Sequence, residues 1–331
     1  MLFLIPHLFP PSRLLEAAAQ DLALPALQTL LARGTRIGCP DEGTEAALCE
    51  ALGIARQQDW PLAPITAAAD GGGGEGYWLR ADPVHLRVMR DRIVLADSSV
   101  FTLSQQEADA LVATISQHFG DALHPLPLHP TRWYLHFPLA PQLRTTPLSV
   151  ASGRDIHPLL PQGDAAGHLR VVLNELQMLL FEHPVNQARE ARGELPVKSV
   201  WLWGGGSAPA APTAGRTVYA RDATARALGA FCGSGVHPLP PQLELVMLKA
   251  TGVVLLDDLT PAGQCGDAYG WREAMRELEQ NWFVPLLAAL RTVDAAGLRL
   301  LDPVNGRGLQ LQWMDAWKIW RRPRSLALAL A

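Results

Sequence analysis

The sequence predicts an α/β protein with a doubly wound, mainly parallel sheet that is interrupted by an inserted, smaller α+β domain. Short apolar segments that are typical of buried parallel strands lie at 1–9, 253–258 and 298–302, and helical patterns alternate with them. Residues 60–76 are rich in Pro, Ala and Gly, as a domain junction would be. The 331 residues, 48% of them hydrophobic, are enough for two domains. We therefore expect a core domain of residues 1–59 and 166–331, with residues 60–165 inserted.

The first third of the chain begins with an apolar strand, residues 1–9. A helix is expected to start at Ser12 and to continue past a proline to Gly34. A second helix is expected in residues 41–54, with Thr44 in its first turn, where free backbone amides face any nearby anion. Thr44 is therefore a candidate site residue, and its alternative role is that of a helix cap.

The expected inserted domain starts with a flexible loop, residues 60–76. Its glycines are not a phosphate loop, because no Lys and Ser or Thr follow them. A helix that ends near Gly120 should begin with a capping box formed by Ser104 and Glu107. A strand and a turn are expected in residues 77–88, and further strands at 92–99 and 132–138.

The return to the expected core domain begins with an amphipathic helix, residues 166–182, whose leucines and valine recur at helical spacing. The apolar segment 199–203 is expected to add a buried parallel strand to the main sheet. A long helix at 267–290 should be kinked or interrupted by Pro285, which cannot donate a backbone hydrogen bond.

Composition excludes several classes of protein. A net charge of −4 and an isoelectric point near 6.2 argue against binding to nucleic acid through a basic face. The four cysteines are too scattered for a zinc site or a disulfide framework, which favours the cytoplasm. Residues 1–9 lack the basic start of a signal peptide, and no apolar run is long enough for a membrane helix. Only residues 317–324 are locally basic and aromatic, as a surface turn or a docking surface for a protein partner would be.

The most informative segment is a polar run that leads into a buried strand and three glycines, residues 183–206. A ligand-binding cluster at the end of a strand is the function we expect for it, with a guanidinium that could clamp a phosphate or carboxylate. The alternative is a solvated turn with a structural Arg that bridges the two domains, followed by glycines that only turn the chain. The candidate residues are His183, Asn186, Arg189, Arg192, Gly204, Gly205 and Gly206.

The same segment carries a resemblance to a known family. H-P-V-N-x-x-R, a P-x-x-S strand and the glycines resemble the archaeal-type cofactor-independent phosphoglycerate mutases of the alkaline phosphatase superfamily. Residues 24–34 resemble an early helix of that family, and residues 43–53 its nucleophile motif. Residues 266–291 look more like the bacterial RpfE-type regulatory proteins. The resemblance implies an alkaline-phosphatase-like fold and a nucleophile position at Thr44.

The mutases that the chain resembles use two divalent metal ions held by Asp and His. Here the first strand ends in Pro-His instead of Asp-Gly, and no histidine follows the acidic pair after the next matching strand. We expect a degenerate site with no cofactor, or at most a single Mg or Mn ion. Each remaining candidate has an alternative role as a solvated, capping or buried structural residue. These candidate ligands are His7, Asp257, Asp258 and Asp302.

The function expected from the sequence is a non-catalytic or weakly active mutase-like protein with a regulatory or ligand-binding role. Its ligand would be a small phosphorylated or acidic metabolite in the cleft between the domains. One alternative is a metal-dependent phosphomutase or phosphatase with Thr44 as nucleophile. A second alternative is a protein-interaction scaffold whose docking surface is residues 317–324. Whether the chain is an enzyme is left open, with the missing ligands favouring a protein that is not.

Overall fold

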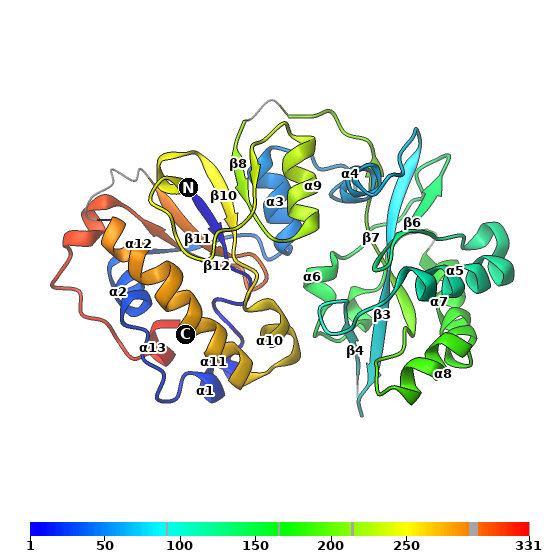
Figure 1. Cartoon of the computed structure of the whole chain (residues 1–331), viewed down its shortest axis with the longest axis horizontal. Helices are drawn as coiled ribbons and strands as arrows, with labels where there is room; N and C mark the ends of the chain where they lie inside the picture. Colours follow the sequence, from blue (N-terminus) through cyan, green and yellow to red (C-terminus); the bar gives the residue numbers. More distant parts are fainter. Residues whose placement is uncertain (91, 165, 213–214, 291–296, 331) are drawn as a thin grey trace. The chain divides into compact units, whose positions relative to one another are not determined.

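The chain forms two compact units (Figure 1). In a computed structural model, residues 1–90, 92–164, 166–212, 215–290 and 297–330 are described. Unit 1 combines Met1–Gly53 with Ala211–Ala331, and unit 2 is the continuous segment Ile54–Ala210. The boundaries differ from those expected, because residues 54–59 and 166–210 belong to unit 2.

Unit 1 is built on a seven-stranded sheet with the strand order β2-β12-β11-β1-β10-β8-β9. β1 lies between β10 and β11 and is parallel to both, and β10, β8 and β9 continue in parallel. Only β12 runs antiparallel, to both β11 and β2. The sheet is thus mainly parallel, as the sequence predicts. Its strands are β1 (Leu2–Leu4), β2 (Thr35–Gly38), β8 (Thr217–Tyr219), β9 (Val236–His237), β10 (Gly252–Leu255), β11 (Leu298–Asp302) and β12 (Arg307–Leu311).

Helices of unit 1 pack on this sheet around one large apolar core. The single helix expected from Ser12 to Gly34 is two helices, because Asp21 adopts a positive φ of 55° and Pro25 begins a new helix at its first position. The helices are α1 (Ser12–Ala18), α2 (Pro25–Arg33), α3 (Thr44–Leu52), α9 (Ala223–Phe231), α10 (Thr260–Cys265), α11 (Ala268–Leu278), α12 (Val284–Ala289) and α13 (Leu326–Leu330), with short turns η3 (Met247–Lys249) and η5 (Trp313–Trp317).

The long helix of unit 1 is interrupted before its proline, as predicted. A π-helical turn, η4 (Glu279–Phe283), separates α11 from α12, and Pro285 lies in the first turn of α12. Because Pro285 has no N–H, the carbonyl of Asn281 is released, and it accepts a hydrogen bond from the backbone N–H of Leu243 at 2.9 Å. The buried Glu279 carboxylate in the same turn accepts hydrogen bonds from the N–H groups of Ala26 and Leu27, which caps α2.

Unit 2 is an antiparallel sheet with helices on both faces. β7 pairs antiparallel with β3 in this sheet, so the expectation of a parallel strand of the main sheet at 199–203 is wrong. Strands in the expected segments 77–88, 92–99 and 132–138 and the Ser104–Glu107 capping box are confirmed. The turn expected within 77–88 is wrong, because that whole segment is one strand. The strands are β3 (Tyr77–Val88), β4 (Ile93–Ala96), β5 (Leu126–His129), β6 (Arg132–Phe137) and β7 (Ser199–Ser207).

The two faces of the unit 2 sheet bury different side chains. Leu79 and Ala81 point toward α5 and α7, whereas Trp78 packs against α4 on the other face, as the alternation of a strand requires. α4 lies within the segment expected to be a flexible loop, where Ala and Leu supply an apolar helix. The helices are α4 (Leu62–Ala69), α5 (Gln105–Phe119), α6 (Leu148–Ala151), α7 (Ala166–Phe181) and α8 (Pro184–Ala191), with short turns η1 (Gly120–Ala122) and η2 (His157–Leu159).

Candidate functional site

The carboxyl ends of the parallel strands bring several predicted residues to one edge of unit 1. His7 follows β1, Asp257 and Asp258 follow β10, and Asp302 ends β11. Ligands of open α/β sheets bind at this edge, because neighbouring loops converge there. We call this part of unit 1 the carboxyl edge.

Thr44 also lies at the carboxyl edge. It is the first residue of α3, and the N–H of the preceding Gly43 donates to the carbonyl of Pro303 at 3.1 Å. This hydrogen bond fixes the start of α3 beside the end of β11. Gly43 has φ = 96°, which a residue with a side chain rarely adopts. The start of α3 at Thr44 and the end of β11 at Asp302 are therefore on neighbouring segments, although they are far apart in the sequence.

The carboxylate of Asp302 is fully buried and its oxygens are saturated. Oδ1 accepts hydrogen bonds from the backbone N–H groups of His7 at 3.1 Å, Val304 at 3.1 Å and Asn305 at 3.2 Å. Oδ2 accepts from the N–H of Phe9 at 2.9 Å and from Nδ2 of Asn305 at 2.9 Å. Burial raises the pKa of this carboxyl, while these hydrogen bonds oppose the shift. Five donors occupy about four lone-pair positions, so Asp302 serves to hold two loops together.

His7 is held in a strained backbone conformation at the same edge. Its φ is 63°, and its carbonyl accepts a hydrogen bond from Nε1 of Trp271 at 3.0 Å. Its ring lies close against Gly263, where an added Cβ would be 2.3 Å from the ring. Strain of this kind persists only where the surroundings enforce it. The loop after β1 is therefore a rigid part of the carboxyl edge.

The acidic pair after β10 is bound to an arginine. Nη2 of Arg221 lies 2.6 Å from a carboxylate oxygen of Asp258 and 3.3 Å from one of Asp257. Partial burial acts to lower the pKa of Arg221, but the two carboxylates outweigh it and the pKa is raised. Burial raises the pKa of Asp257. The positive charge that balances the two carboxylates is thus supplied by the protein.

These residues do not fit a dinuclear metal site. Both carboxylate oxygens of Asp302 accept hydrogen bonds from N–H groups of the protein, and Asp257 and Asp258 face a guanidinium. Among the residues that the structure describes, no three His, Cys, Asp or Glu side chains form a cluster that could hold a metal ion. A two-metal mechanism needs open carboxylate and imidazole ligands that clamp a phosphoryl group, and the donors at this edge are arranged for other contacts.

Unit 2 contains the polar run from His183 to Arg192. Asn186 is buried, and its side chain bridges two backbone segments. Nδ2 donates to the carbonyls of Leu180 at 2.8 Å and Val197 at 2.7 Å, and Oδ1 accepts from the N–H of Val197 at 2.9 Å. The side chain of His183 caps α8, accepting from the N–H of Val185 at 3.2 Å.

The two arginines of this run make contacts within unit 2. Arg189 is 1% exposed, and its donors reach the carbonyls of Leu195 at 2.9 Å and Thr102 at 2.7 Å. Its third contact is Glu107, at 3.2 Å, which also binds the exposed Arg192 at 2.8 Å. A structural role for the arginine, the alternative to ligand binding, accounts for these contacts. They join segments of unit 2, whereas that alternative expected an Arg that bridges the two domains. Ligand binding by the run stays a prediction.

The glycines of β7 allow close packing. A Cβ added at Gly205 would lie 2.2 Å from Oη of Tyr77, and one at Gly206 would lie 2.5 Å from Cβ of Pro61. Gly204 has φ = 67°, a conformation that favours glycine. Packing of β7 against its neighbours therefore explains these three residues without a ligand, and their expected role in binding also stays a prediction.

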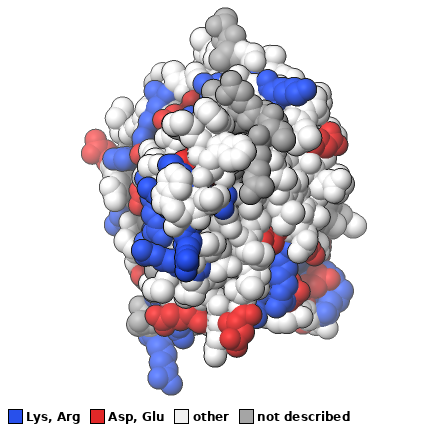
Figure 2. Space-filling model, turned by 90° about the vertical axis from the view of Figure 1, so that its left-hand side faces the viewer, with Lys and Arg blue, Asp and Glu red and all other residues white. Residues whose placement is uncertain are grey.

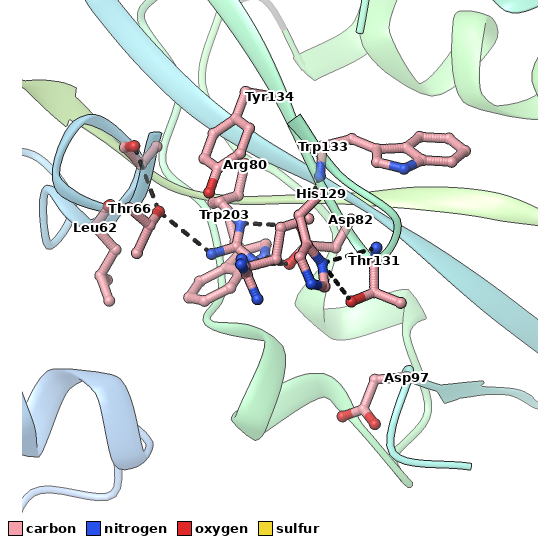
Figure 3. Close-up of polar contacts among 12 residues, drawn as sticks. Leu62, Thr66, Arg80, Asp82, Asp97, His129, Thr131, Trp133, Tyr134 and Trp203 are labelled. Carbon is pink, nitrogen blue, oxygen red and sulfur yellow. Dashed lines mark hydrogen bonds and ion pairs between the residues drawn. The ribbon is translucent and has the colours of Figure 1, made fainter. Parts of the chain in front are cut away.

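A buried ion pair in unit 2 is the polar site that sequence reasoning missed (Figure 3). Nε and Nη2 of Arg80 donate to the two carboxylate oxygens of Asp82 at 2.9 and 2.7 Å. Nη1 donates to Oγ1 of Thr66 at 3.3 Å, and Nε1 of Trp203 donates to Asp82 at 2.9 Å. The guanidinium also lies 5.0 Å from the ring of Trp203 and 5.3 Å from that of Tyr134.

Both side chains of this pair are at least 97% buried. Burial raises the pKa of Asp82, and the neighbouring Arg80 opposes that shift. Burial acts to lower the pKa of Arg80, but the Asp82 carboxylate outweighs it and the pKa is raised. A signal for the pair was present in the sequence. Two opposite charges two residues apart in a strand point to the same face, here the face of Trp78. The cluster connects β3, β6, β7 and α4, which indicates that it stabilises unit 2.

No family model matches the chain. The chain is 30% identical over 152 residues to a probable 2,3-bisphosphoglycerate-independent phosphoglycerate mutase of Geobacter sulfurreducens, covering 44% of this chain and 38% of that protein. It is 28% identical over 206 residues to the 2,3-bisphosphoglycerate-independent phosphoglycerate mutase of Methanosarcina mazei, covering 57% of this chain and 50% of that protein. The chain thus spans half or less of the length of these curated relatives.

The solved structures include a cofactor-independent phosphoglycerate mutase from Thermoplasma acidophilum that is 17% identical to this chain. The comparison covers 100% of this chain and 94% of that one, with a TM-score of 0.43. No helix within the described residues has the length and apolar character needed to cross a membrane. Over about half of its residues, this chain is similar in sequence, at low identity, to 2,3-bisphosphoglycerate-independent phosphoglycerate mutases.

Proposed function

We propose that this protein is a mutase-like protein without metal-dependent catalysis, and that it binds a phosphorylated or acidic metabolite in a regulatory role. The observation that carries the proposal is the saturation of Asp302 by five N–H donors. A carboxylate in that state has no lone pair left to offer a metal ion. The regulatory part agrees with the resemblance of residues 266–291 to RpfE-type proteins.

The ligand class follows from the relatives and from the groups at the carboxyl edge. The relatives are named as phosphoglycerate mutases, whose substrate carries a phosphate and a carboxylate. Arg221 is 53% exposed although it pairs with Asp257 and Asp258, and the first turn of α3 presents backbone N–H groups at the same edge of unit 1. A guanidinium and a helix start both suit an anion. 3-Phosphoglycerate is therefore the first probe to use.

Two measurements test the proposal. Elemental analysis of protein purified without chelator, repeated after loading with Mn, should find fewer than two metal ions per chain. Isothermal titration calorimetry should detect 3-phosphoglycerate in the absence of metal, and Arg221→Ala should weaken that binding. About two tightly held ions per chain, or no binding of 3-phosphoglycerate, would contradict the proposal.

A second candidate is a metal-dependent phosphotransferase with Thr44 as nucleophile. The hydrogen bond from Gly43 to Pro303 favours it, because it sets Thr44 beside Asp302. Phosphatase or mutase turnover that requires Mn or Mg, disappears in Thr44→Ala and persists in Thr44→Ser would establish this candidate. Turnover that survives Thr44→Ala would remove it.

A further inference from the structure

A pocket of about 650 Å³ on unit 1 is lined by four arginines. They are Arg36, Arg321, Arg322 and Arg324, and the last three come from the loop between η5 and α13. The volume lies in the range of small-molecule sites. The pocket lies away from the carboxyl edge. Arg36 is near the start of β2, whereas the carboxyl edge is formed where β2 and the parallel strands end.

The charge of the loop arginines is not balanced within the described part of the chain. None of the ion pairs there includes Arg321, Arg322 or Arg324, and all three side chains are exposed. The single acidic residue of residues 313–325 is Asp315, which is paired with Lys318. Figure 2 looks onto the side of unit 1 that carries this loop, where Lys and Arg side chains gather among uncharged residues. An anion would therefore meet guanidinium groups that have not been neutralised.

Hydrogen bonds attach the loop to α2 and the following helix, α13, to β2. Nε2 of Gln28 in α2 donates to the carbonyl of Arg324 at 2.6 Å, and Nη2 of Arg36 donates to the carbonyl of Ala329 at 2.6 Å. Pro323 lies between two of the arginines and restricts the backbone further. The backbone of the loop and the guanidinium of Arg36 are thus partly positioned before any ligand arrives, which lowers the entropic cost of binding.

We propose that this pocket binds a free small molecule that carries two or more phosphate groups. Arginine offers planar, bidentate donors that match phosphate oxygens. The three loop arginines together carry more positive charge than a single phosphate group, with its charge of about −1.5 to −2, can balance. Because the arginines line a hollow instead of a flat face, a compact ligand fits them better than a lipid surface does. The pocket is separate from the carboxyl edge, so this site does not depend on the proposed function.

The test is calorimetric titration of the full chain with tripolyphosphate, pyrophosphate and inorganic phosphate. Tripolyphosphate should bind once per chain, more tightly than inorganic phosphate, and salt should weaken the binding. Arg321→Ala with Arg322→Ala should weaken tripolyphosphate at least about tenfold, since charged hydrogen bonds are lost. The double variant Arg87→Ala with Arg226→Ala removes two exposed arginines elsewhere and should bind like the wild type.

Several results would overturn the proposal. These are the absence of tripolyphosphate binding, equal weakening in both double variants, and undiminished binding in the Arg321 and Arg322 variant. A further experiment measures whether the protein sediments with vesicles of phosphatidylserine and phosphatidylcholine. If the protein sediments with them through Trp317 and Trp320, which are 57% and 72% exposed, and tripolyphosphate neither binds nor competes, the surface binds lipid instead. Circular dichroism of each variant confirms that it is folded.

Discussion

The backbone N–H of His7 donates to Oδ1 of Asp302 at 3.1 Å, although the two residues are 295 positions apart. This contact fastens the loop after the first strand of the sheet to the end of β11. It also uses an oxygen that a metal-binding carboxylate would leave open. The contact therefore gives Asp302, at the carboxyl edge, a structural role in unit 1.

Asp302→Asn should destabilise unit 1 by about 2 to 5 kcal/mol, because an amide NH₂ would face buried N–H donors that lose their acceptor. Urea unfolding followed by circular dichroism measures the loss. Asp258→Asn is the control, since its partner Arg221 is half exposed and such pairs contribute about 1 kcal/mol or less. Equal stability of Asp302→Asn and the wild type would show that the saturated carboxylate is not structural.

Breaking the Arg80–Asp82 pair on one side should be costly. Asp82→Asn or Arg80→Met alone should reduce the free energy of unfolding by about 3 to 5 kcal/mol, because each leaves a buried charge without its partner. The double variant should be less destabilised than the sum of the two single variants. A double-mutant cycle from urea unfolding measures this coupling, and strictly additive losses would show that the two residues do not act as a pair.

Unit 2 should lose stability in mild acid through His183. Burial lowers the pKa of this ring below its usual value of 6.5, and Nδ1 must stay unprotonated to accept from Val185. The neutral form then carries its proton on Nε2, which faces Oγ1 of Thr114 at 2.9 Å. The stability that depends on the neutral ring is present above pH 6.5 and is lost as the pH falls through the lower pKa of the folded state.

His183→Asn should remove this part of the pH dependence, because Asn also caps a helix and does not titrate. Urea unfolding at pH 7.5 and 5.5 gives the comparison. His157→Asn, at an exposed ring, should keep the acid sensitivity of the wild type. If His183→Asn keeps the full sensitivity as well, the ring is not its source.

Gly206→Ala should destabilise unit 2 even when no ligand is present, because the added Cβ would meet Pro61 at 2.5 Å. A loss of about 1 to 3 kcal/mol is expected from overpacking. Gly167→Ala in α7 has open space around it and should be neutral or stabilising by up to about 1 kcal/mol. Thermal unfolding of both variants measures the difference. Normal stability in Gly206→Ala would favour a ligand-related role for the glycine.

Local signals predicted much of the fold. Ser104 and Glu107 form their capping box, and Pro285 interrupts a helix, because each of these effects depends on residues within a few positions. Local signals do not predict which strand an apolar strand pairs with. β7 is buried along nearly its whole length, and a run of that kind satisfies a parallel or an antiparallel neighbour equally well. Its pairing with β3 and the domain boundary that follows from it could not be read from the residues.

The sequence indicates where in the fold the candidate residues lie, but it does not indicate the hydrogen bonds that their side chains make. The strand ends locate Asp257, Asp258 and Asp302 at one edge, as the rule for parallel sheets requires. Whether a carboxylate is open or saturated depends on loops that meet only in the folded protein, such as the one after β1. Asn186 shows the same limit, since its spacing in the sequence does not reveal the carbonyls of Leu180 and Val197 around it.

The central position of β1 has a consequence for the order of events during protein synthesis. β1 is made first, but its neighbours β10 and β11 begin at residues 252 and 298. At about 5 to 20 residues per second, the first strand waits for roughly ten seconds or longer before its partners leave the ribosome. Residues 54–210 emerge completely during that wait and can pair among themselves. A nascent chain would thus carry a finished inserted unit while the apolar strand β1 still needs protection from aggregation.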